Sequence, residues 1–235
     1  MHQNKRIKVG VFGAGRGMYL AENFMLLDAE IVALCDRHKE RREAAMKKLP
    51  KGTAEYENFD EFINHPMDAV ILANNFYQHA PYAIKCFERN IHVFSECTAF
   101  GTLGEGVELV RAYEKSKSIF MLAENYPFML FNLEMKRKAD GGTLGKILYA
   151  EGEYNHPVNE WDTEFTKTYK FYPEHWRHFL PRTYYITHAL GPVMCATGAT
   201  PKIVTAFASF APKTTRSTRE FIIAPAHIGQ GSRVT

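Results

Sequence analysis

The sequence has no long apolar run, and no stretch approaches the roughly 18 apolar residues that suggest a membrane-spanning helix. Its first residues, Met1 to Arg6, are polar and lead directly into a strand-like segment. They lack the apolar core and small-residue cleavage site of a signal peptide. From these absences we expect a cytoplasmic protein without a membrane partner.

Cysteine is scarce, and basic residues are dispersed. The four cysteines are far apart and form no C-x-x-C pair, which argues against a disulfide framework and against a metal site. We expect reduced thiols and no bound metal. Lys and Arg number 29 against 26 Asp and Glu, a net charge of +3 without a basic block, so we expect no nucleic-acid partner.

The first half of the chain alternates two kinds of segment. Near-continuous apolar runs, typical of buried parallel strands, cover residues 7–12, 30–35, 69–73, 91–95 and 119–123. Segments of helical spacing lie between or after them, at residues 19–27, 39–49, 80–89 and 103–116. This alternation predicts an α/β domain with a doubly wound parallel sheet of the Rossmann type, which we assign to residues 1–124.

The pattern changes after residue 124, and we assign residues 125–235 to a second, α+β domain. Predicted helices cover 128–139 and 184–197, and predicted strands cover 147–154, 201–210 and 220–224. Residues 155–182 are irregular and rich in aromatic side chains. That composition suits stacking on a sugar, and it suits plain surface packing equally well.

A glycine-rich loop joins the first predicted strand to the first predicted helix, the context in which such a loop binds a dinucleotide. Gly13 permits the tight turn, and Gly15 lets the backbone approach a pyrophosphate at the helix N-terminus. The third glycine of the pattern belongs at position 18, where Met18 stands, and Gly17 lies one residue early. The predicted cofactor loop is Gly13, Ala14, Gly15, Arg16, Gly17 and Met18.

Asp36 ends the second predicted strand, where an acidic residue accepts hydrogen bonds from the adenosine ribose. Arg37 follows it and is a residue type that can meet the 2′-phosphate of NADP. We favour NAD because the Asp36 carboxylate would repel that phosphate, and NADP stays the alternative. The alternative interpretation is purely structural: the glycines turn a strand into a helix, Asp36 ends a strand, and neither binds a nucleotide.

With the loop and Asp36, segments 68–79 (DAVILANNFYQH) and 92–98 (HVFSECT) make the chain resemble the Gfo/Idh/MocA oxidoreductases over nearly its whole length. The resemblance implies an NAD-binding Rossmann domain followed by a substrate domain. The open, mostly antiparallel sheet of that second domain often forms a homo-oligomer face. The resemblance also implies further cofactor-binding residues at Asn74, Asn75, His79, Glu96, Cys97, Glu124 and Asn125.

Family members usually continue beyond the position of Thr235. We therefore expect a truncated copy whose C-terminal sheet is incomplete and has an unpaired edge. Such an edge predicts poor solubility or reliance on a partner that covers it.

Two departures from the family pattern bear on chemistry. The Glu-Lys-Pro motif reads Glu96-Cys97-Thr98, so the lysine that commonly assists proton transfer is missing. The Asp-x-Gly-x-His motif keeps only its histidine, His188. With segments 124–126 (ENY) and 151–156 (EGEYNH), this version resembles the branch that contains NAD-dependent α-N-acetylgalactosaminidases.

In that branch the resemblance places Tyr154 and His188 at the sugar, and Glu124 and Asn125 at the nicotinamide end. An imidazole and a phenol can shuttle protons to and from a ring hydroxyl. We therefore predict His188 as general base, assisted by Tyr154. A purely structural role stays the alternative for both, and a small apolar filler is the alternative for Cys97.

Three functions follow from these observations. The first is an NAD-dependent oxidoreductase that transfers hydride to or from a sugar or polyol. The second is a glycosidase that retains its NAD and works by oxidation, elimination, addition and reduction. The third is a nucleotide-binding protein without turnover, which the missing lysine and aspartate would allow.

Overall fold

The computed structural model describes residues 6–154, 182–205, 207–208, 222–223 and 226–229. The chain divides into two compact units, Met1–Ala123 and Glu124–Thr235. Most of the aromatic-rich segment expected at 155–182 lies outside the described residues, as do parts of the strands expected at 201–210 and 220–224. No helix within the described ranges is long and apolar enough to cross a membrane.

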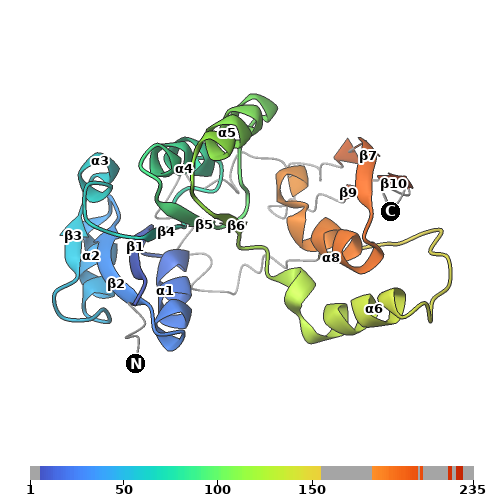
Figure 1. Ribbon diagram of the computed structural model, residues 1–235, viewed down its shortest axis with the longest axis horizontal. Helices are drawn as coiled ribbons and strands as arrows, with labels where there is room; N and C mark the ends of the chain where they lie inside the picture. Colours follow the sequence, from blue (N-terminus) through green and yellow to red (C-terminus); the bar gives the residue numbers. More distant parts are fainter. Residues whose placement is uncertain (1–5, 155–181, 206, 209–221, 224–225, 230–235) are drawn as a thin grey trace, which may run out of the picture. The chain divides into compact units, whose positions relative to one another are not determined.

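The first unit contains a six-stranded sheet in the order β3-β2-β1-β4-β5-β6, with every neighbouring pair parallel (Figure 1). This is the strand order of a Rossmann sheet, and it confirms the predicted fold class. Its order reverses between β1 and β4, where a dinucleotide crosses such a sheet. The strands are β1 (Lys8–Phe12), β2 (Glu30–Cys35), β3 (Ala54–Tyr56), β4 (Ala69–Leu72), β5 (His92–Ser95) and β6 (Phe120–Leu122).

Helices cover both faces of this sheet, since alternate side chains of each strand point to opposite faces. One apolar cluster joins the strands to α1 and α2, and a second joins them to α3, α4 and α5. In Figure 1 the strands lie between α1 on one side and α4 and α5 on the other. The helices are α1 (Arg16–Leu26), α2 (Lys39–Met46), α3 (Phe59–Phe62), α4 (His79–Phe87) and α5 (Leu103–Lys115).

Local sequence explains where several of these helices begin. Thr102 accepts a hydrogen bond from the Glu105 amide, and the Glu105 carboxylate accepts one from the Thr102 amide, a reciprocal cap that starts α5. The Asn58 side chain caps α3 in the same position by accepting from the Asp60 amide. The first helix starts at Arg16, three residues before the predicted start at 19, because it follows the glycine loop directly.

The cysteines of this unit are free and buried. Burial raises the pKa of the Cys35 and Cys86 thiols to about 12, so both are protonated and inert at neutral pH.

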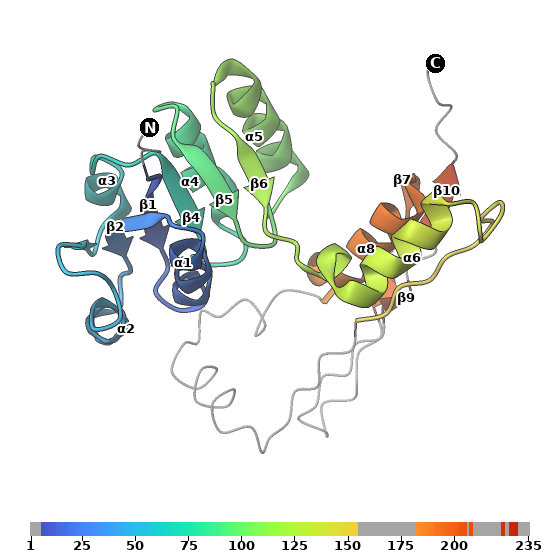
Figure 2. The same cartoon turned by 60° about the horizontal axis from the view of Figure 1, so that its bottom comes forward.

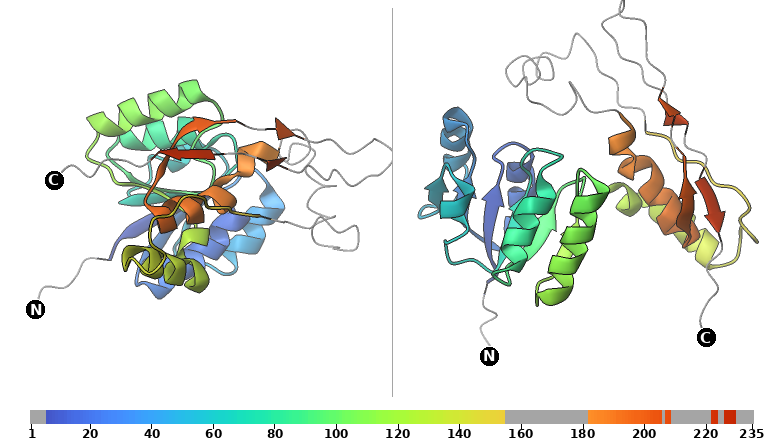
Figure 3. Two further views of the ribbon diagram at one scale, coloured as in Figure 1. Left: turned by 90° about the vertical axis from the view of Figure 1, so that its right-hand side faces the viewer. Right: turned by 90° about the horizontal axis from the view of Figure 1, so that it is seen from above.

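The second unit combines helices with antiparallel strand pairs. Figure 3 shows α6 (Leu130–Asp140) beside α8 (Thr187–Thr197), with β7 (Thr200–Val204) paired to β10 (Ala226–Gly229). A second antiparallel pair joins β8 (Phe207–Ala208) and β9 (Ile222–Ile223). Short 3-10 helices precede α6 and α8, at Tyr126–Phe128 (η1) and Arg182–Tyr185 (η3), and Gly198 with a φ of +66° ends α8.

The strand predicted at 147–154 is wrong. Among the described residues this segment pairs with no other strand, and Figure 2 shows it as a plain chain between α6 and the grey trace. At Gly152 its backbone packs directly on the carbonyl group of Ala189 in α8, because a Cβ there would collide with that oxygen. The segment therefore packs on a helix at Gly152, whereas a strand would need a hydrogen-bonded neighbour.

Candidate functional site

The glycine loop has the geometry that a nucleotide-binding turn needs. Gly13 has a φ of +104°, a conformation that side chains disfavour, and its amide donates to the Cys35 carbonyl oxygen at 2.8 Å. A Cβ at Gly13 would collide with the carbonyl oxygen of Ala73, at the end of β4. The turn therefore brings β1, β2 and β4 together at their carboxyl ends and requires glycine at its first position.

Gly15 stands at the N-terminus of α1 and faces open space. A Cβ added to Gly15 would meet no described atom within 4 Å, and no described side chain caps the amides of the first turn. These amides and the helix dipole favour an anion at this end of the helix. The loop therefore fits a pyrophosphate that approaches the backbone at Gly15.

Gly17 explains the irregular spacing of the motif. A Cβ at Gly17 would lie 2.9 Å from a methyl carbon of Val11 and 3.3 Å from the Cβ of Ala73. Gly17 thus provides the close contact between helix and sheet that the usual pattern assigns to position 18. Met18 is buried in the apolar cluster of α1, so its side chain fits at the position where the usual pattern has glycine.

Asp36 lies against the glycine loop, as the sequence predicts. Its carboxylate accepts hydrogen bonds from the Ala14 amide at 2.7 Å and from the His38 amide at 2.8 Å, and the residue is 6% exposed. Arg42 donates to the Asp36 carbonyl oxygen at 2.7 Å and is itself paired with Glu55 at 2.9 Å. The carboxylate is therefore fixed at the loop, where a ribose attached to a bound pyrophosphate would lie.

Arg37 is exposed, in contrast to the buried Asp36 before it. Its Nε lies 3.2 Å from Nε2 of His38.

The ends of β4 and β5 hold the remaining candidates of the first unit. Glu96 follows β5 and forms an ion pair with Arg16 of α1, with the Arg16 Nε 2.6 Å from the Glu96 Oε1. This pair connects the ends of β1 and β5, which flank β4 in the sheet. Cys97 is buried, and its amide donates to the Glu96 carboxylate at 3.2 Å.

Three polar side chains follow β4. Asn75 donates to the Gln78 side chain at 3.2 Å, and Asn74 approaches the Gln78 carbonyl oxygen at 3.4 Å. His79 is 1% exposed, and its Nδ1 lies 2.6 Å from the Thr98 carbonyl oxygen. Within the described part of the chain, the buried Oδ1 of Asn74 and Nε2 of His79 have no hydrogen-bond partner. The unsatisfied Asn74 oxygen, which follows a switch-point strand, fits a polar cofactor nearby.

The second unit contains a buried pair that the chain brings together from distant positions. Nδ1 of His188 lies 2.7 and 2.8 Å from the two carboxylate oxygens of Glu124, although 64 residues separate them. The Tyr126 amide also donates to Glu124, at 2.9 Å. Burial would raise the pKa of the Glu124 carboxyl, but the hydrogen bonds from His188 and the Tyr126 amide outweigh it and hold that pKa below its usual value.

A tyrosine extends this pair into a chain of three groups. The Tyr185 hydroxyl oxygen lies 2.7 Å from Nε2 of His188, so the sequence of contacts is Glu124, His188, Tyr185. Because an ionised carboxylate only accepts, Nδ1 of His188 carries a proton. In the neutral ring Nε2 then accepts from the Tyr185 hydroxyl. A carboxylate that orients an imidazole beside a hydroxyl is an arrangement that can accept and return a proton.

Aromatic rings enclose the imidazole. The Tyr126 ring stacks on His188 at a centroid distance of 4.2 Å and an interplanar angle of 15°. The Tyr154 ring packs edge-on against His188 at 4.7 Å and 82°, and against Tyr185 at 5.5 Å and 77°. The second unit therefore gathers Tyr154 and His188, the two predicted catalytic residues, with Glu124.

Sequence reasoning missed Tyr185. Its signal is the spacing of three residues before His188, which places both side chains on one side of a helical turn. Asn125, a predicted cofactor residue, starts η1, and its carbonyl oxygen accepts from the Phe128 amide at 3.1 Å.

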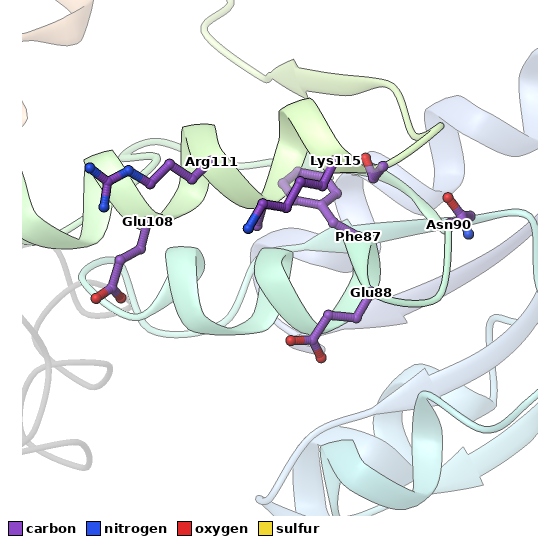
Figure 4. Close-up of a pocket in the computed structure, with 8 residues that line it drawn as sticks. Phe87, Glu88, Asn90, Glu108, Arg111 and Lys115 are labelled. Atoms are coloured by element: carbon purple, nitrogen blue, oxygen red, sulfur yellow. The ribbon is translucent and has the colours of Figure 1, made fainter.

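A shallow groove of about 350 Å³ lies between the C-terminal turns of α4 and α5 (Figure 4). Glu88, Glu108, Arg111 and Lys115 are among the residues that line it, so its walls carry both acidic and basic groups. The two helices end where the next strands begin, so this groove lies at the amino ends of the strands. Nucleotide sites of such sheets lie at the opposite edge, which excludes the groove as the cofactor site.

Proteins similar to this chain include glycosyl hydrolases. The chain is 30% identical over 201 residues to "Glycosyl hydrolase family 109 protein 1" of Bacteroides fragilis, covering 79% of this chain and 42% of that protein. It is 28% identical over 205 residues to a glycosyl hydrolase family 109 protein of Saccharopolyspora erythraea, covering 81% and 44%. The chain thus spans less than half the length of these relatives.

Solved structures share the fold. The myo-inositol 2-dehydrogenase of Lactobacillus plantarum matches with a TM-score of 0.75 and 21% identity over 88% of this chain and 60% of that chain. The scyllo-inositol dehydrogenase of Lactobacillus casei, solved with NAD(H) and scyllo-inositol, matches with a TM-score of 0.70 and 20% identity over 88% and 61%.

The family itself is shown by the first unit. Residues 7–124, about half of the chain, match the model of an oxidoreductase family with an NAD-binding Rossmann fold. The match covers the switch-point sheet, the glycine loop and Asp36, the features from which the geometry indicates a dinucleotide site. With its NAD-binding Rossmann fold, the chain belongs to the Gfo/Idh/MocA oxidoreductase family.

Proposed function

We propose that this protein is an NAD-dependent oxidoreductase acting on a hydroxyl group of a sugar or polyol. The observation that carries the proposal is the chain of Glu124, His188 and Tyr185 in a unit attached to an NAD-binding domain. When bound, NAD supplies the site that accepts or returns hydride. The names of two structural neighbours, both inositol dehydrogenases, favour a polyol or a sugar as the class of substrate.

The residues of the second unit would manage the proton of the reacting hydroxyl. Nε2 of His188 accepts the proton, either directly or through the Tyr185 hydroxyl at 2.7 Å. Glu124 fixes the ring with Nδ1 protonated and stabilises the imidazolium that results. Tyr154 packs on the same ring and stands as a second phenol that can assist. This division of roles compensates for the lysine that Cys97 replaces.

The first unit would hold the cofactor. Gly13, Gly15 and the N-terminus of α1 receive the pyrophosphate, and Asp36 accepts from the adenosine ribose. Asp36 also favours NAD over NADP, because its carboxylate would repel a 2′-phosphate.

Net hydrolysis of a glycoside is the second candidate. The observation that favours it is the 30% identity to a glycosyl hydrolase family 109 protein. NAD-dependent glycosidases fall outside the usual scheme of two carboxylates, so a His–Tyr proton relay suits this reaction as well. The two candidates share a cofactor and a base, and they differ in whether reduced cofactor accumulates.

One set of experiments separates these functions. Denaturing the purified protein and identifying any released nucleotide by mass tests the cofactor. Accumulation of NADH with a panel of polyols and free sugars supports the oxidoreductase. Release of nitrophenol from α-linked aryl glycosides without accumulating NADH supports the glycosidase. Nucleotide binding without either reaction would contradict both and leave a binding protein.

A homo-oligomer that forms through the C-terminal sheet is part of the same proposal. Ile203 and Val204 of β7 are each 63% exposed, so this strand presents apolar side chains that a second copy would cover. Light scattering on the purified protein tests it, and a monomer at micromolar concentration would contradict it.

A further inference from the structure

His79 links two loops that leave neighbouring strands. It begins α4, at the end of the loop that follows β4, and its Nδ1 lies 2.6 Å from the carbonyl oxygen of Thr98 in the turn that follows β5. A carbonyl oxygen only accepts, so Nδ1 donates this hydrogen bond. The imidazole is 1% exposed, so solvent does not compete for this hydrogen bond.

Other contacts join the same two loops. The Thr98 hydroxyl lies 3.4 Å from the carbonyl oxygen of Phe76 in the loop after β4, and 3.1 Å from that of Phe100 within its own turn. A Cβ at Gly101 would lie 2.9 Å from the carbonyl oxygen of Tyr77, so the backbones approach closely there. The hydrogen bond from His79 is the shortest of these connections.

The turn that His79 holds contains Glu96 and Cys97. The Glu96 amide donates to the Leu72 carbonyl oxygen at 2.8 Å, and its carboxylate pairs with Arg16, the first residue of α1. Contacts therefore connect His79, through this turn, to the N-terminus of α1, the helix that follows the glycine loop. Burial lowers the pKa of His79 despite nearby carbonyl groups, so the ring stays neutral and keeps one donor.

We propose that His79 is a positioning residue: its hydrogen bond to Thr98 fixes the Glu96–Cys97–Thr98 turn in the orientation that cofactor binding requires. The inference rests on the proposed function and deepens it, since it gives His79 a role through the turn and no direct contact with the nucleotide. Glu96 and Arg16 then meet the cofactor in a preformed arrangement, which lowers the cost of ordering them on binding.

Two matched variants test the donor at a defined position. In His79→Asn the amide nitrogen occupies the place of Nδ1 and can still donate to Thr98, whereas in His79→Gln it occupies the place of Nε2 and cannot. The measurements are the dissociation constant of NAD, amide hydrogen exchange at Glu96 and Cys97 without nucleotide, and the thermal midpoint. Thr98→Val, which removes only the hydroxyl and leaves the carbonyl group, is the control for the weaker contact.

We expect His79→Gln to accelerate exchange at the turn and to weaken NAD binding, each on the order of tenfold, the effect of one lost hydrogen bond. His79→Asn should stay within about threefold of the wild type in both, which a general loss of core packing would not allow. The thermal midpoint measures the packing that each variant loses. If it falls equally in both, lost packing does not explain a difference between them in exchange or affinity.

Equal behaviour of the two variants in exchange and affinity would overturn the proposal. So would faster exchange in His79→Gln with unchanged NAD affinity, because the turn would then be held by His79 without consequence for the cofactor. Failure of the proposed function looks different: the wild type itself would bind no NAD, while the exchange rates would still report whether His79 holds the turn.

Discussion

The two units build their candidate sites from different atoms. In the first, the partners of Asp36 and Gly13 are backbone groups: the Ala14 and His38 amides and the Cys35 carbonyl. In the second, side chains bind side chains, and Glu124 lies 64 residues from His188. A backbone site depends on local turns that a short motif specifies, whereas a side-chain site exists only after distant segments have folded together.

The comparison predicts that the second unit can lose its chemistry without loss of cofactor binding. His188→Asn retains a donor toward Glu124 and removes Nε2, so we expect turnover to fall roughly 10²- to 10⁴-fold, the usual effect of a general base. The dissociation constant of NAD should stay within about twofold, since binding belongs to the backbone site. Steady-state assays, with whichever sugar or polyol of the panel is turned over, measure the first effect, and an NAD titration measures the second.

His65→Asn is the matched control, because His65 contacts Tyr56 in the first unit and lies outside both sites. It should turn over normally. A His188 variant as active as this control would contradict the relay.

The adjacent tyrosines sharpen the same point. Tyr185→Phe removes only the hydroxyl that lies 2.7 Å from His188, and we expect turnover to fall about 10²-fold, the lower end of the acid–base range. Tyr184 is 40% exposed, and Tyr184→Phe should have no effect. Rates are measured with both variants at several pH values. Equal activity of the two variants would mean that the Tyr185 hydroxyl takes no part in proton transfer, because phenylalanine keeps the ring.

Glycine substitutions separate cofactor binding from folding in the first unit. Gly15→Ala adds a methyl group to open space, so the thermal midpoint should stay unchanged. The NAD dissociation constant should rise about tenfold or more, because the backbone can no longer approach the pyrophosphate closely. In Gly13→Ala the added methyl group would collide with the Ala73 carbonyl group, and the φ of +104° disfavours any side chain. We expect the free energy of unfolding to fall by about 2 kcal/mol or more, which lowers the thermal midpoint by several degrees.

Calorimetry and NAD titration of both variants supply these numbers. If Gly15→Ala bound NAD as tightly as the wild type, the phosphate would not lie at Gly15.

The smallest expected effect is the pH dependence of the second unit. The pKa of Glu124 is lower in the folded chain than its usual value of about 4.5, so its ionised form stabilises the folded state. That stability is present above the unfolded pKa and is lost as the pH falls through the folded pKa. Between about pH 5 and pH 3 the midpoint of the wild type should therefore fall more steeply than that of Glu124→Gln. Parallel curves would refute the ionised pair.

The sequence predicts the backbone site well because strand, glycine turn and helix are adjacent in the chain. The positions of Gly13 and Asp36 followed from the motif, while the packing role of Gly17 needed the distance to Val11. Strand β3 and helix α3 escaped prediction because three and four residues are too few to show a period.

The side-chain site was predicted only in part. The resemblance named His188 and Tyr154, but the partners of His188 depend on where α8 lies relative to Glu124, which no local pattern specifies. The segment at 147–154 failed for a related reason, since Gly152 packs on α8 and a strand needs a paired neighbour.

The central claim is that NAD binds through backbone groups of the glycine loop. Amide hydrogen exchange of the whole protein, with and without saturating NAD, tests it most directly. We expect slower exchange at residues 13–17, where the nucleotide covers the loop and the start of α1. Saturation with NAD that leaves exchange at these residues unchanged would contradict the account.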